Sequence, residues 1–388
     1  MNDVARIEPV MRARELGPAI AAAADEIERT RRLPQGLLDR LHEARLFRML
    51  LPRSVGGDEV APGDYVEAIA EAGRHDGSVA WCLSIANSTG LIAPYLDIEI
   101  AREIFADPRA VVAWGPPNES TARAVPGGYR VSGRWSFASG CRHSTWMGAH
   151  ATVVEPDGSL RVNRFGRPTL KTWLFPTAQA TRLDTWNPIG LRGTASDSYE
   201  LSDLFVDEAH TSTREDPEAR REPGRLYAFP QQTLYSVGIS SVALGIARGM
   251  LDAFLGLAKE KTPRGMARLA DSGVVQSEIA RAEANMGAAR AFLLDTIGDV
   301  YARAASTAPI SVDDRARVRL AGTFAIENAV AVADYTYKSA GVDAIFPGSP
   351  FERRFRDIHT LAQQIQSRAA HFEAIGQVLL GAPPAVFF

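Results

Sequence analysis

Cysteine is scarce in this sequence, which holds only Cys82 and Cys141 among its 388 residues. Two cysteines in a chain of this length do not form a disulfide framework, and we expect both to be small buried apolar side chains. The seven histidines form neither a His-x-x-x-His nor a His-Glu-x-x-His pair, the spacings that place two ligands on one helix face. The sequence therefore predicts no metal site.

An excess of one charge and a long apolar run are also lacking. The formal net charge is −3, and no stripe of Lys and Arg interleaved with aromatic residues is present, so nucleic acid is not an expected partner. No apolar run reaches the roughly 18 residues of a membrane span. Residues 1–16 mix acids and bases and lack the apolar core of a signal peptide. We therefore expect a soluble, cytoplasmic protein that does not insert into a membrane.

Helical signals fill the first third of the chain. Apolar residues recur at helical spacing between polar ones, and Pro34 suits the first turn of a helix. The segment 78–91 is apolar and small throughout, which is typical of a buried helix. Helices are expected over residues 16–30, 34–47, 62–74, 78–91 and 98–105.

The middle third has strand signals instead, and the last third returns to long helices. From about 111 to 207, short β-branched or aromatic runs alternate with turn residues, which indicates a small β-barrel or sandwich. The later helices are expected over residues 235–258, 274–304, 312–340 and 355–380, which together form a four-helix bundle. The predicted fold class is α+β, with a helical domain over 1–112, a β-barrel over 113–212 and a four-helix bundle over 213–388.

Four motifs occur in a fixed order along the chain. They are the segments 51–57 (LPRSVGG, followed by DGSVAW at 76–81), 127–140 (GGYRVSGRWSFASG), 190–198 (GLRGTASDS) and 354–357 (RFRD). In this order and at these distances they resemble the acyl-CoA dehydrogenase superfamily over nearly the whole chain. The resemblance implies an N-terminal helical domain, a middle β-barrel and a C-terminal four-helix bundle, in agreement with the pattern above.

The resemblance also implies a flavin site. An isoalloxazine ring needs flat apolar walls and a few polar groups at its edge. The residues that the resemblance places around the flavin are Trp114, Phe137, Ser139, Gly140, Thr194, Ser196, Arg264, Gln276 and Gly341, with the arginine on the flavin phosphate, often of a neighbouring subunit. The sequence alone also allows other roles. Phe137 would share the core-facing side of an alternating strand with Trp135, while Arg264 fits a solvated loop and Gly341 a helix end.

Acidic residues are missing where an acyl-CoA dehydrogenase carries its catalytic base. That base takes the α-proton of a thioester, and the family places it in one of two regions. Here residues 358–372 and 223–251 contain no Asp or Glu. The motif spellings resemble instead the oxygenase branch, which includes 4-hydroxyphenylacetate oxygenase components and dibenzothiophene monooxygenase.

Membership of this branch implies a monooxygenase that receives reduced FMN or FAD from a separate reductase. Molecular oxygen adds to the flavin C4a atom, and the hydroperoxide oxygenates a small, aromatic or secondary-metabolite substrate. The absence of a nicotinamide-binding Gly-x-Gly-x-x-Gly agrees with an external reductase. The family also implies a homotetramer, and the segment 237–257, with Arg248 and Asp252 as its only charges, is too apolar for the surface of a lone monomer.

The chain departs from this branch at its usual histidines. Seven residues after the Asp of the RFRD motif stands Gln364, and Asn87 lies near the place of a second histidine. A glutamine forms hydrogen bonds but does not exchange a proton as histidine does. We therefore expect Gln364 to position oxygen or substrate, with Ser139 at the flavin, and His143 or His359 to serve where a proton must move. Two alternatives remain open: an FAD-dependent dehydrogenase or oxidase of the same fold, and a non-catalytic scaffold.

Overall fold

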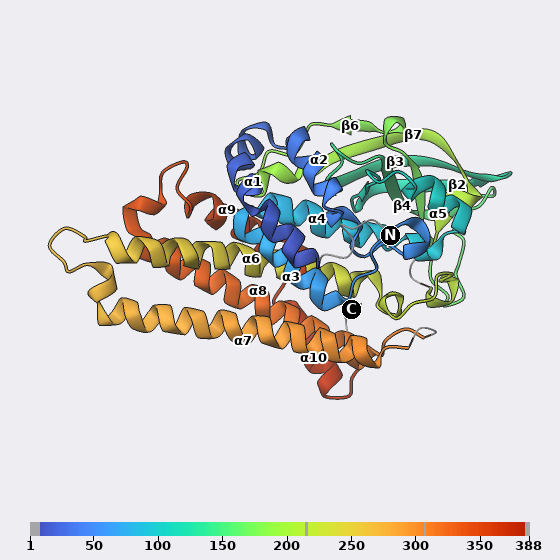
Figure 1. Cartoon of the computed structure of the whole chain (residues 1–388). Coiled ribbons are helices and arrows are strands. Elements are labelled where there is room, and N and C mark those ends of the chain that lie inside the picture. Colours follow the sequence, from blue (N-terminus) through green and yellow to red (C-terminus); the bar gives the residue numbers. More distant parts are fainter. Residues whose placement is uncertain (1–7, 214–215, 306–307, 385–388) are drawn as a thin grey trace.

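The computed structural model describes residues 8–213, 216–305 and 308–384. It has a helical N-terminal part, a middle sheet and a helical C-terminal part, which confirms the predicted fold class (Figure 1). Helix α4 (Gly77–Gly90) lies between the sheet and the long helix α6 (Gln231–Glu260). All residues of α4 are buried, as predicted for the apolar segment 78–91.

The N-terminal helices follow the predicted segments with two differences. The first helix begins earlier than predicted, at Pro9, because a proline fits the first turn, where no amide donor is needed. The second ends earlier, at Glu43, because Arg45 adopts a left-handed φ of 58° and a 3₁₀ turn over Leu46–Arg48 follows. The helices are α1 (Pro9–Thr30), α2 (Gln35–Glu43), α3 (Pro62–His75), α4 and α5 (Ile98–Phe105).

The middle part is one mixed sheet in the strand order β6-β7-β3-β2-β4-β5-β8, with β1 paired to β4. Its core is aromatic: Trp135 stacks on Tyr199 at 5.2 Å, and Tyr129 meets Trp173 edge-on at 5.3 Å. All four rings are fully buried. The strands are β1 (Val112–Trp114), β2 (Pro117–Val125), β3 (Gly128–Ala138), β4 (Trp146–Val154), β5 (Leu170–Pro176), β6 (Thr181–Leu183), β7 (Asp197–Asp207) and β8 (Thr211–Ser212).

The end of β3 departs from the expected alternation. Trp135 faces the core, but Phe137 has a φ of 60° and is 62% exposed, so the two rings do not share a face as the sequence suggested. The pairing of β3 with β7 shifts register between Trp135 and Ala138, as in a β-bulge. The bulge turns Phe137 outward at the place where the strand ends.

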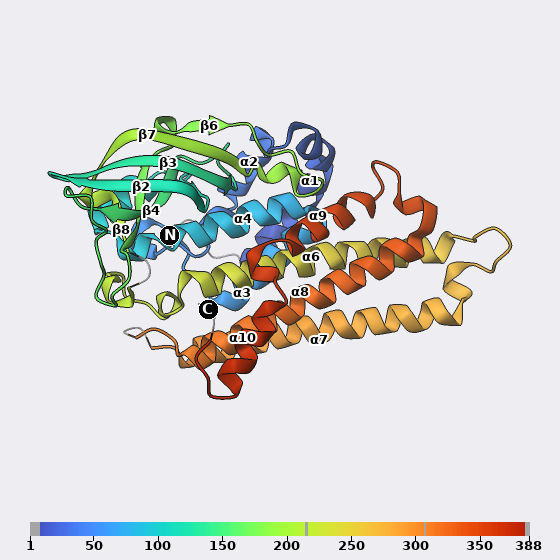
Figure 2. The ribbon, with the colours of Figure 1, turned by 180° about the vertical axis from the view of Figure 1, so that it is seen from behind.

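Within the described residues, the C-terminal part contains three long α-helices and two short ones. The predicted single helix over 355–380 is wrong, because the backbone of Gln364 is extended, with a ψ of 146°, and a 3₁₀ turn over Ile365–Ser367 follows it. Figure 2 shows the two resulting helices apart, with α10 against α8. The helices are α6, α7 (Gly273–Arg303), α8 (Val312–Ala340), α9 (Glu352–Ala362) and α10 (Ala370–Leu379).

Helix α6 is buried by its own chain. It packs against α3, α4 and α8. By length and composition alone it could cross a membrane, yet 67% of its most apolar window is buried inside the molecule, as in the core helix of a globular fold. The low charge of 237–257 therefore serves packing within one chain and is not by itself a reason for subunit assembly.

Glycines allow α3 and α6 to approach closely. A Cβ on Gly245 would overlap the backbone oxygen of Ala70 and lie 2.8 Å from Gly73 Cα, whereas a Cβ on the exposed Gly256 of the same helix would meet nothing within 4 Å. Gly245 and Gly256 therefore have the same helical backbone but differ in how closely a neighbouring helix approaches them.

We predict opposite effects of alanine at these two glycines. Gly245→Ala lowers the free energy of unfolding by about 1–3 kcal/mol through overpacking. Gly256→Ala raises it by up to about 1 kcal/mol, because alanine restricts the unfolded chain and favours the helix. Chemical denaturation of the two variants beside wild type measures both, and equal effects would contradict the close approach.

Candidate active site

A chain of hydrogen bonds joins α4, the end of β3 and the loop before β7. The indole Nε1 of Trp81 donates to Ser139 Oγ at 3.0 Å, and Ser139 Oγ lies 2.7 Å from Ser196 Oγ. Ser196 Oγ lies 2.7 Å from Thr194 Oγ1, which donates to the Leu191 carbonyl at 2.9 Å. The three hydroxyl groups are buried. We call Trp81, Ser139, Ser196, Thr194 and the Leu191 carbonyl the hydroxyl chain.

The direction of the hydroxyl chain is fixed at both ends. An indole nitrogen only donates and a carbonyl only accepts, and each hydroxyl has one hydrogen. The hydrogen of Thr194 goes to the carbonyl, so Ser196 must donate to Thr194, and Ser139 must in turn donate to Ser196. Every hydroxyl hydrogen is therefore used. Each of the three oxygens keeps one lone pair, so the hydroxyl chain has only acceptor capacity left.

Unusual backbone conformations bring the three hydroxyls together. Gly140 has a φ of 80°, which glycine adopts without strain, and its amide donates to the Thr194 carbonyl at 2.8 Å. Leu191 and Ala195 are left-handed, with φ of 50° and 48°, so the loop turns sharply on both sides of Thr194. The predicted grouping of Ser139, Thr194 and Ser196 in space is therefore present.

Both cysteines lie beside this loop, buried as predicted. Cys141 Sγ donates to the Ala195 carbonyl at 3.2 Å, and Cys82 Sγ lies 4.0 Å from the Thr194 carbonyl. Burial, reinforced by the nearby Asp197, raises the pKa of the Cys141 thiol to about 12, and burial raises the pKa of the Cys82 thiol as well. Both thiols stay protonated and act as apolar packing.

Large apolar side chains remain exposed on the segments around the hydroxyl chain. Phe137 at the end of β3 meets Trp186 edge-on at 6.2 Å. Ile189, two residues before Leu191, is 69% exposed, and Ile365 in the 3₁₀ turn after α9 is 52% exposed. Apolar side chains of this kind can wall a flat ring, and Phe137 and Ile189 each stand two residues from a member of the hydroxyl chain.

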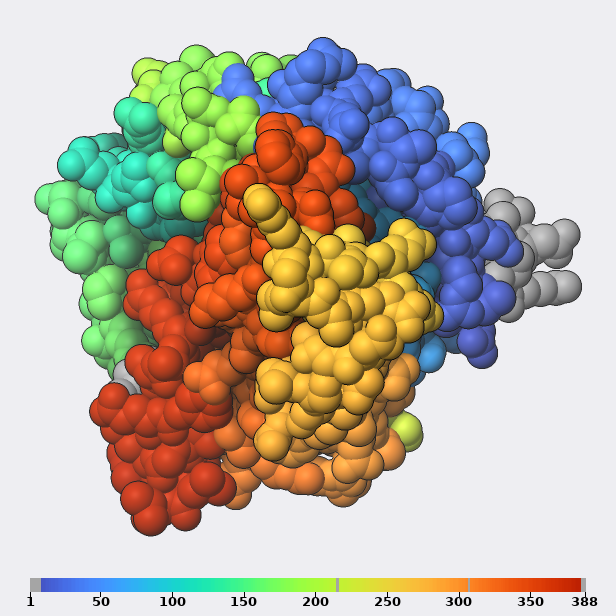
Figure 3. Space-filling view, turned by 90° about the vertical axis from the view of Figure 1, so that its left-hand side faces the viewer, coloured from blue at the N-terminus to red at the C-terminus, as the bar shows by residue number. Residues whose placement is uncertain are grey.

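The loop that carries Thr194 is held by α4 and α9. The Leu191 amide donates to Asp357 Oδ1 at 2.6 Å, and the Gly193 amide donates to Ser78 Oγ at 3.1 Å. A Cβ on Gly190 would overlap the backbone oxygen of Arg356, so the loop lies directly on α9. Figure 3 shows the two segments side by side at this end of the molecule, the loop in light green and α9 in orange-red.

Two buried carboxyls meet at the start of α4. Asp76 caps the helix by accepting from the Val79 amide at 2.9 Å, and Asp357 packs against Gly77. Burial, with the repulsion of Asp76, raises the pKa of Asp357 to about 7, and burial raises the pKa of Asp76 too. Near neutral pH a part of the Asp357 population therefore keeps a proton that an exposed aspartate would have lost.

Gln364 is engaged in local hydrogen bonds. Its Nε2 donates to Tyr235 Oη of α6 at 2.8 Å, and its Oε1 accepts from the Gln366 amide at 2.6 Å, which caps the 3₁₀ turn. One donor hydrogen and one acceptor lone pair remain on the amide. Its expected contact with oxygen or substrate stays a prediction.

The two candidate histidines lie in different places. His359 Nε2 is 2.9 Å from Asp334 Oδ1 of α8, and its ring packs on Phe355 at 4.4 Å. His143 follows Gly140 by three residues and lies near Phe47, 5.7 Å between ring centres. Burial, with the neighbouring His42, lowers the pKa of His143 to about 4, so this ring is neutral at neutral pH. Of the two, His143 is the one beside the hydroxyl chain.

The remaining predicted flavin residues are not members of the hydroxyl chain. Trp114 meets His150 edge-on at 5.1 Å and packs on Gly148 of β4. Arg264 is exposed on the connection from α6 to α7, and Gln276 is exposed in the first turn of α7, at the end of the long helices remote from the sheet (Figure 1). Gly341 has a φ of 63° and ends α8, as one reading of the sequence proposed. Their roles at a flavin stay predictions.

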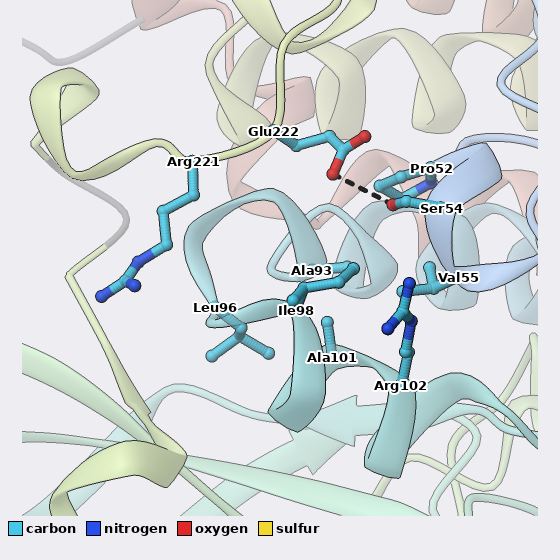
Figure 4. Close-up of a pocket in the computed structure, with 10 residues that line it drawn as sticks. All are labelled: Pro52, Ser54, Val55, Ala93, Leu96, Ile98, Ala101, Arg102, Arg221 and Glu222. Carbon is cyan, nitrogen blue, oxygen red and sulfur yellow. Dashed lines mark hydrogen bonds between the residues drawn. The ribbon is translucent and has the colours of Figure 1, made fainter.

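A separate cavity of about 230 Å³ lies near the other end of α4 (Figure 4). Ser54 Oγ donates to Glu222 at 3.0 Å on one side of it, and Arg102 and Arg221 carry charge at its edge. None of its lining residues belongs to the hydroxyl chain. We place the candidate site at the hydroxyl chain, because the motif residues Ser139, Thr194 and Ser196 meet there.

Sequence reasoning missed two residues of this site. Trp81 supplies the donor that fixes the first hydroxyl, and Asp357 holds the loop by its amide. Both occur in the quoted motifs DGSVAW and RFRD. The motifs gave the positions, but only the folded chain brings α4 and α9 to the loop.

Comparisons with known proteins agree with this geometry. Family models described as the N-terminal and C-terminal domains of acyl-CoA dehydrogenase match residues 13–98 and 237–368. The chain is 29% identical to indole-3-acetate monooxygenase of Pseudomonas putida, over 95% of both chains. It is 28% identical to the oxygenase component of FADH(2)-dependent resorcinol hydroxylase of Rhizobium sp., over 94% of this chain and 91% of that protein.

A solved structure gives the same result. The HsaA monooxygenase of M. tuberculosis superposes with a TM-score of 0.88 and 25% identity, over 98% of both chains. The chain belongs to the acyl-CoA dehydrogenase family. Its relatives are flavin-dependent monooxygenases, which confirms the oxygenase branch that the motifs predicted.

We predict that Asp357 makes stability depend on pH in a defined window. Its pKa of about 7 in the folded protein exceeds that of an unfolded aspartate, about 4. Between these values the folded chain holds a proton that the unfolded chain releases, so this group's contribution to stability falls as pH rises from about 4 to 7. Other charges around it are Asp76 at the N-cap of α4, Glu28 of α1, and Arg354 and Arg356 of α9.

Melting temperatures of wild type and Asp357→Asn between pH 4 and 8 measure this contribution. The asparagine cannot titrate. The melting temperature of wild type minus that of Asp357→Asn should therefore fall as pH rises from 4 to about 7, and should stay constant above pH 7. A difference that stays constant from pH 4 to 7 would show that Asp357 titrates normally.

Proposed function

We propose that the protein is the oxygenase component of a two-component flavin-dependent monooxygenase. It takes reduced FMN or FAD from a separate reductase and uses molecular oxygen to oxygenate a small aromatic substrate. The observation that carries the proposal is the hydroxyl chain, which offers three buried acceptor oxygens beside exposed apolar rings. It is a soluble enzyme, and we place it in the cytoplasm.

The residues at this site suit a flavin ring. An isoalloxazine has a flat apolar body, and its edge carries an N–H group in every redox state and a second one when reduced. Ser139, Ser196 and Thr194 have only acceptor capacity left, which matches N–H donors at that edge. Phe137 and Ile189 would cover the ring. Bound reduced flavin would supply the electrons that activate oxygen.

The 3₁₀ turn after α9 favours an oxygenase over a dehydrogenase. A thioester dehydrogenase needs a carboxylate placed to remove a proton. In this chain the exposed side chain of the 3₁₀ turn after α9 is Ile365, and residues 358–372 contain no acid at all. An apolar wall keeps water from an oxygen adduct, which is the requirement of oxygenation.

The substrate class follows from the relatives and from Gln364. Two relatives are named for indole-3-acetate and resorcinol, both small aromatic compounds. A glutamine in place of the branch's usual histidine cannot remove a proton from a phenol. We therefore propose an electron-rich aromatic substrate that reacts in its neutral form.

The test is stopped-flow spectroscopy of the protein with chemically reduced FMN or FAD, mixed with oxygenated buffer. We expect at least one flavin to return to its oxidised spectrum at least tenfold more slowly than free flavin, because the site shields it from water. Anaerobic titration gives the dissociation constant independently. Reoxidation at the rate of free flavin, with bleaching of bound FAD by an acyl-CoA, would point to the dehydrogenase instead.

Ser196→Ala tests the site itself, because it interrupts the hydroxyl chain at its centre. Ser241→Ala is the matched control: this buried serine bonds only the Val237 carbonyl of its own helix, at 2.8 Å. We expect Ser196→Ala to weaken reduced-flavin binding about tenfold, the value of one buried hydrogen bond of about 1.4 kcal/mol. The control should bind as wild type does, and equal behaviour of the two variants would remove the hydroxyl chain from the flavin site.

We also propose the homotetramer, with a second copy completing each flavin site. Arg264 and Gln276 support it, since both are exposed at the end of the long helices remote from their own hydroxyl chain. An arginine fork suits a flavin phosphate of a neighbouring copy. Light scattering should give four times the chain mass of 42.0 kDa, and a monomer mass with undiminished flavin binding would reject the assembly.

A further inference from the structure

We propose that Asp357 is a positioning residue that holds the hydroxyl chain and the Gln364 segment in one fixed arrangement. The inference rests on the proposed function, because it assigns both segments to the flavin site. The residue is 2% exposed, so its carboxyl is reserved for contacts inside the protein.

The first step is the bond to Leu191. Asp357 Oδ1 accepts from the Leu191 amide at 2.6 Å, and the carbonyl of the same residue is the last acceptor of the hydroxyl chain. Because Leu191 is left-handed, with a φ of 50°, its amide lies outside the strand ladder. The carboxyl therefore fixes the residue that sets the direction of all three hydroxyls.

The second step is that the same stretch of α9 also holds the two loop residues that precede Leu191. The Arg356 guanidinium donates to the Ile189 carbonyl and, at 2.9 Å, to Glu28 of α1. The Arg356 backbone oxygen leaves room only for glycine at 190. The loop thus has no freedom to move away from α9 while Asp357 is in place.

The third step concerns the 3₁₀ turn that follows α9. Helix α9 continues from Asp357 to Ala362, and Gln364 then caps the 3₁₀ turn that presents Ile365. The side chain of Gln364 is anchored on Tyr235 of α6 at 2.8 Å. The last part of α9, from Asp357 to Ala362, therefore links the carboxyl that holds Leu191 to the turn that presents Ile365.

The surroundings of Asp357 are costly for a residue that only fills space. Burial and the neighbouring carboxyl of Asp76 both oppose its charge, and a buried acid beside another acid destabilises a fold. An apolar residue of the same shape would avoid that cost but would lose the acceptor for Leu191. The carboxyl at residue 357 is therefore explained by its role as the acceptor for the Leu191 amide and not by the packing of its side chain.

The experiment compares two substitutions of the same shape. Asp357→Asn keeps an oxygen acceptor for the Leu191 amide, and Asp357→Leu removes it. We expect the leucine variant to bind reduced flavin at least tenfold more weakly and to speed flavin reoxidation, while the asparagine variant stays within about threefold of wild type. Asp76→Asn, at the neighbouring buried carboxyl, is the matched control and should behave as wild type does.

Two further measurements keep the outcome clear. Hydrogen exchange of peptides covering 190–196, measured without flavin, should rise in Asp357→Leu and stay unchanged in Asp357→Asn. This measurement tests whether Asp357 holds the loop even if the flavin proposal fails. Asp357→Ala replaces the leucine variant if that protein does not fold. The inference would be overturned if the variant without an acceptor had a lower melting temperature but wild-type flavin affinity and wild-type hydrogen exchange. It would also be overturned if the asparagine variant lost as much flavin affinity as the leucine variant.

Discussion

The hydrogen bond from Thr194 to the Leu191 carbonyl decides the chemistry of the whole site. It uses the only hydrogen of Thr194, and this fixes Ser196 and then Ser139 as donors within the chain. The indole of Trp81 closes the other end as a pure donor. The contacts of this loop with α4 and α9, through Gly190, Gly193 and the Asp357 carboxyl, hold Leu191 where its carbonyl can take that role.

Much of the fold was predictable from the sequence because burial leaves a periodic trace. Helices α3, α4, α5 and α8 lie where spacing and composition place them, and α4 is buried throughout as its apolar composition required. The bulge that exposes Phe137 leaves no such trace, since an aromatic residue at positive φ looks like any strand residue. The break after α9 is similar: residues 363–369 contain no glycine or proline, so nothing in the pattern ends the helix.

The site was predictable in part, through the resemblance and not through spacing. Ser139, Thr194 and Ser196 meet as the family motifs imply, although 55 residues separate the first from the second. Trp81 and Asp357 were quoted only as motif letters, because a hydrogen bond between segments this far apart has no signature in one sequence. The apolar character of 237–257 was attributed to subunit contacts, but α3, α4 and α8 cover it within the chain.

The acceptor-only character of the hydroxyl chain bears on redox selectivity. A reduced flavin carries one more N–H at its ring edge than an oxidised flavin, whose corresponding nitrogen is itself an acceptor. In the flavin site proposed above, acceptor oxygens at that nitrogen would attract the first form and repel the second. Such a site would bind the reduced flavin more tightly than the oxidised flavin, so the flavin would be released after it is oxidised. Such turnover suits an enzyme that borrows its cofactor for each catalytic cycle.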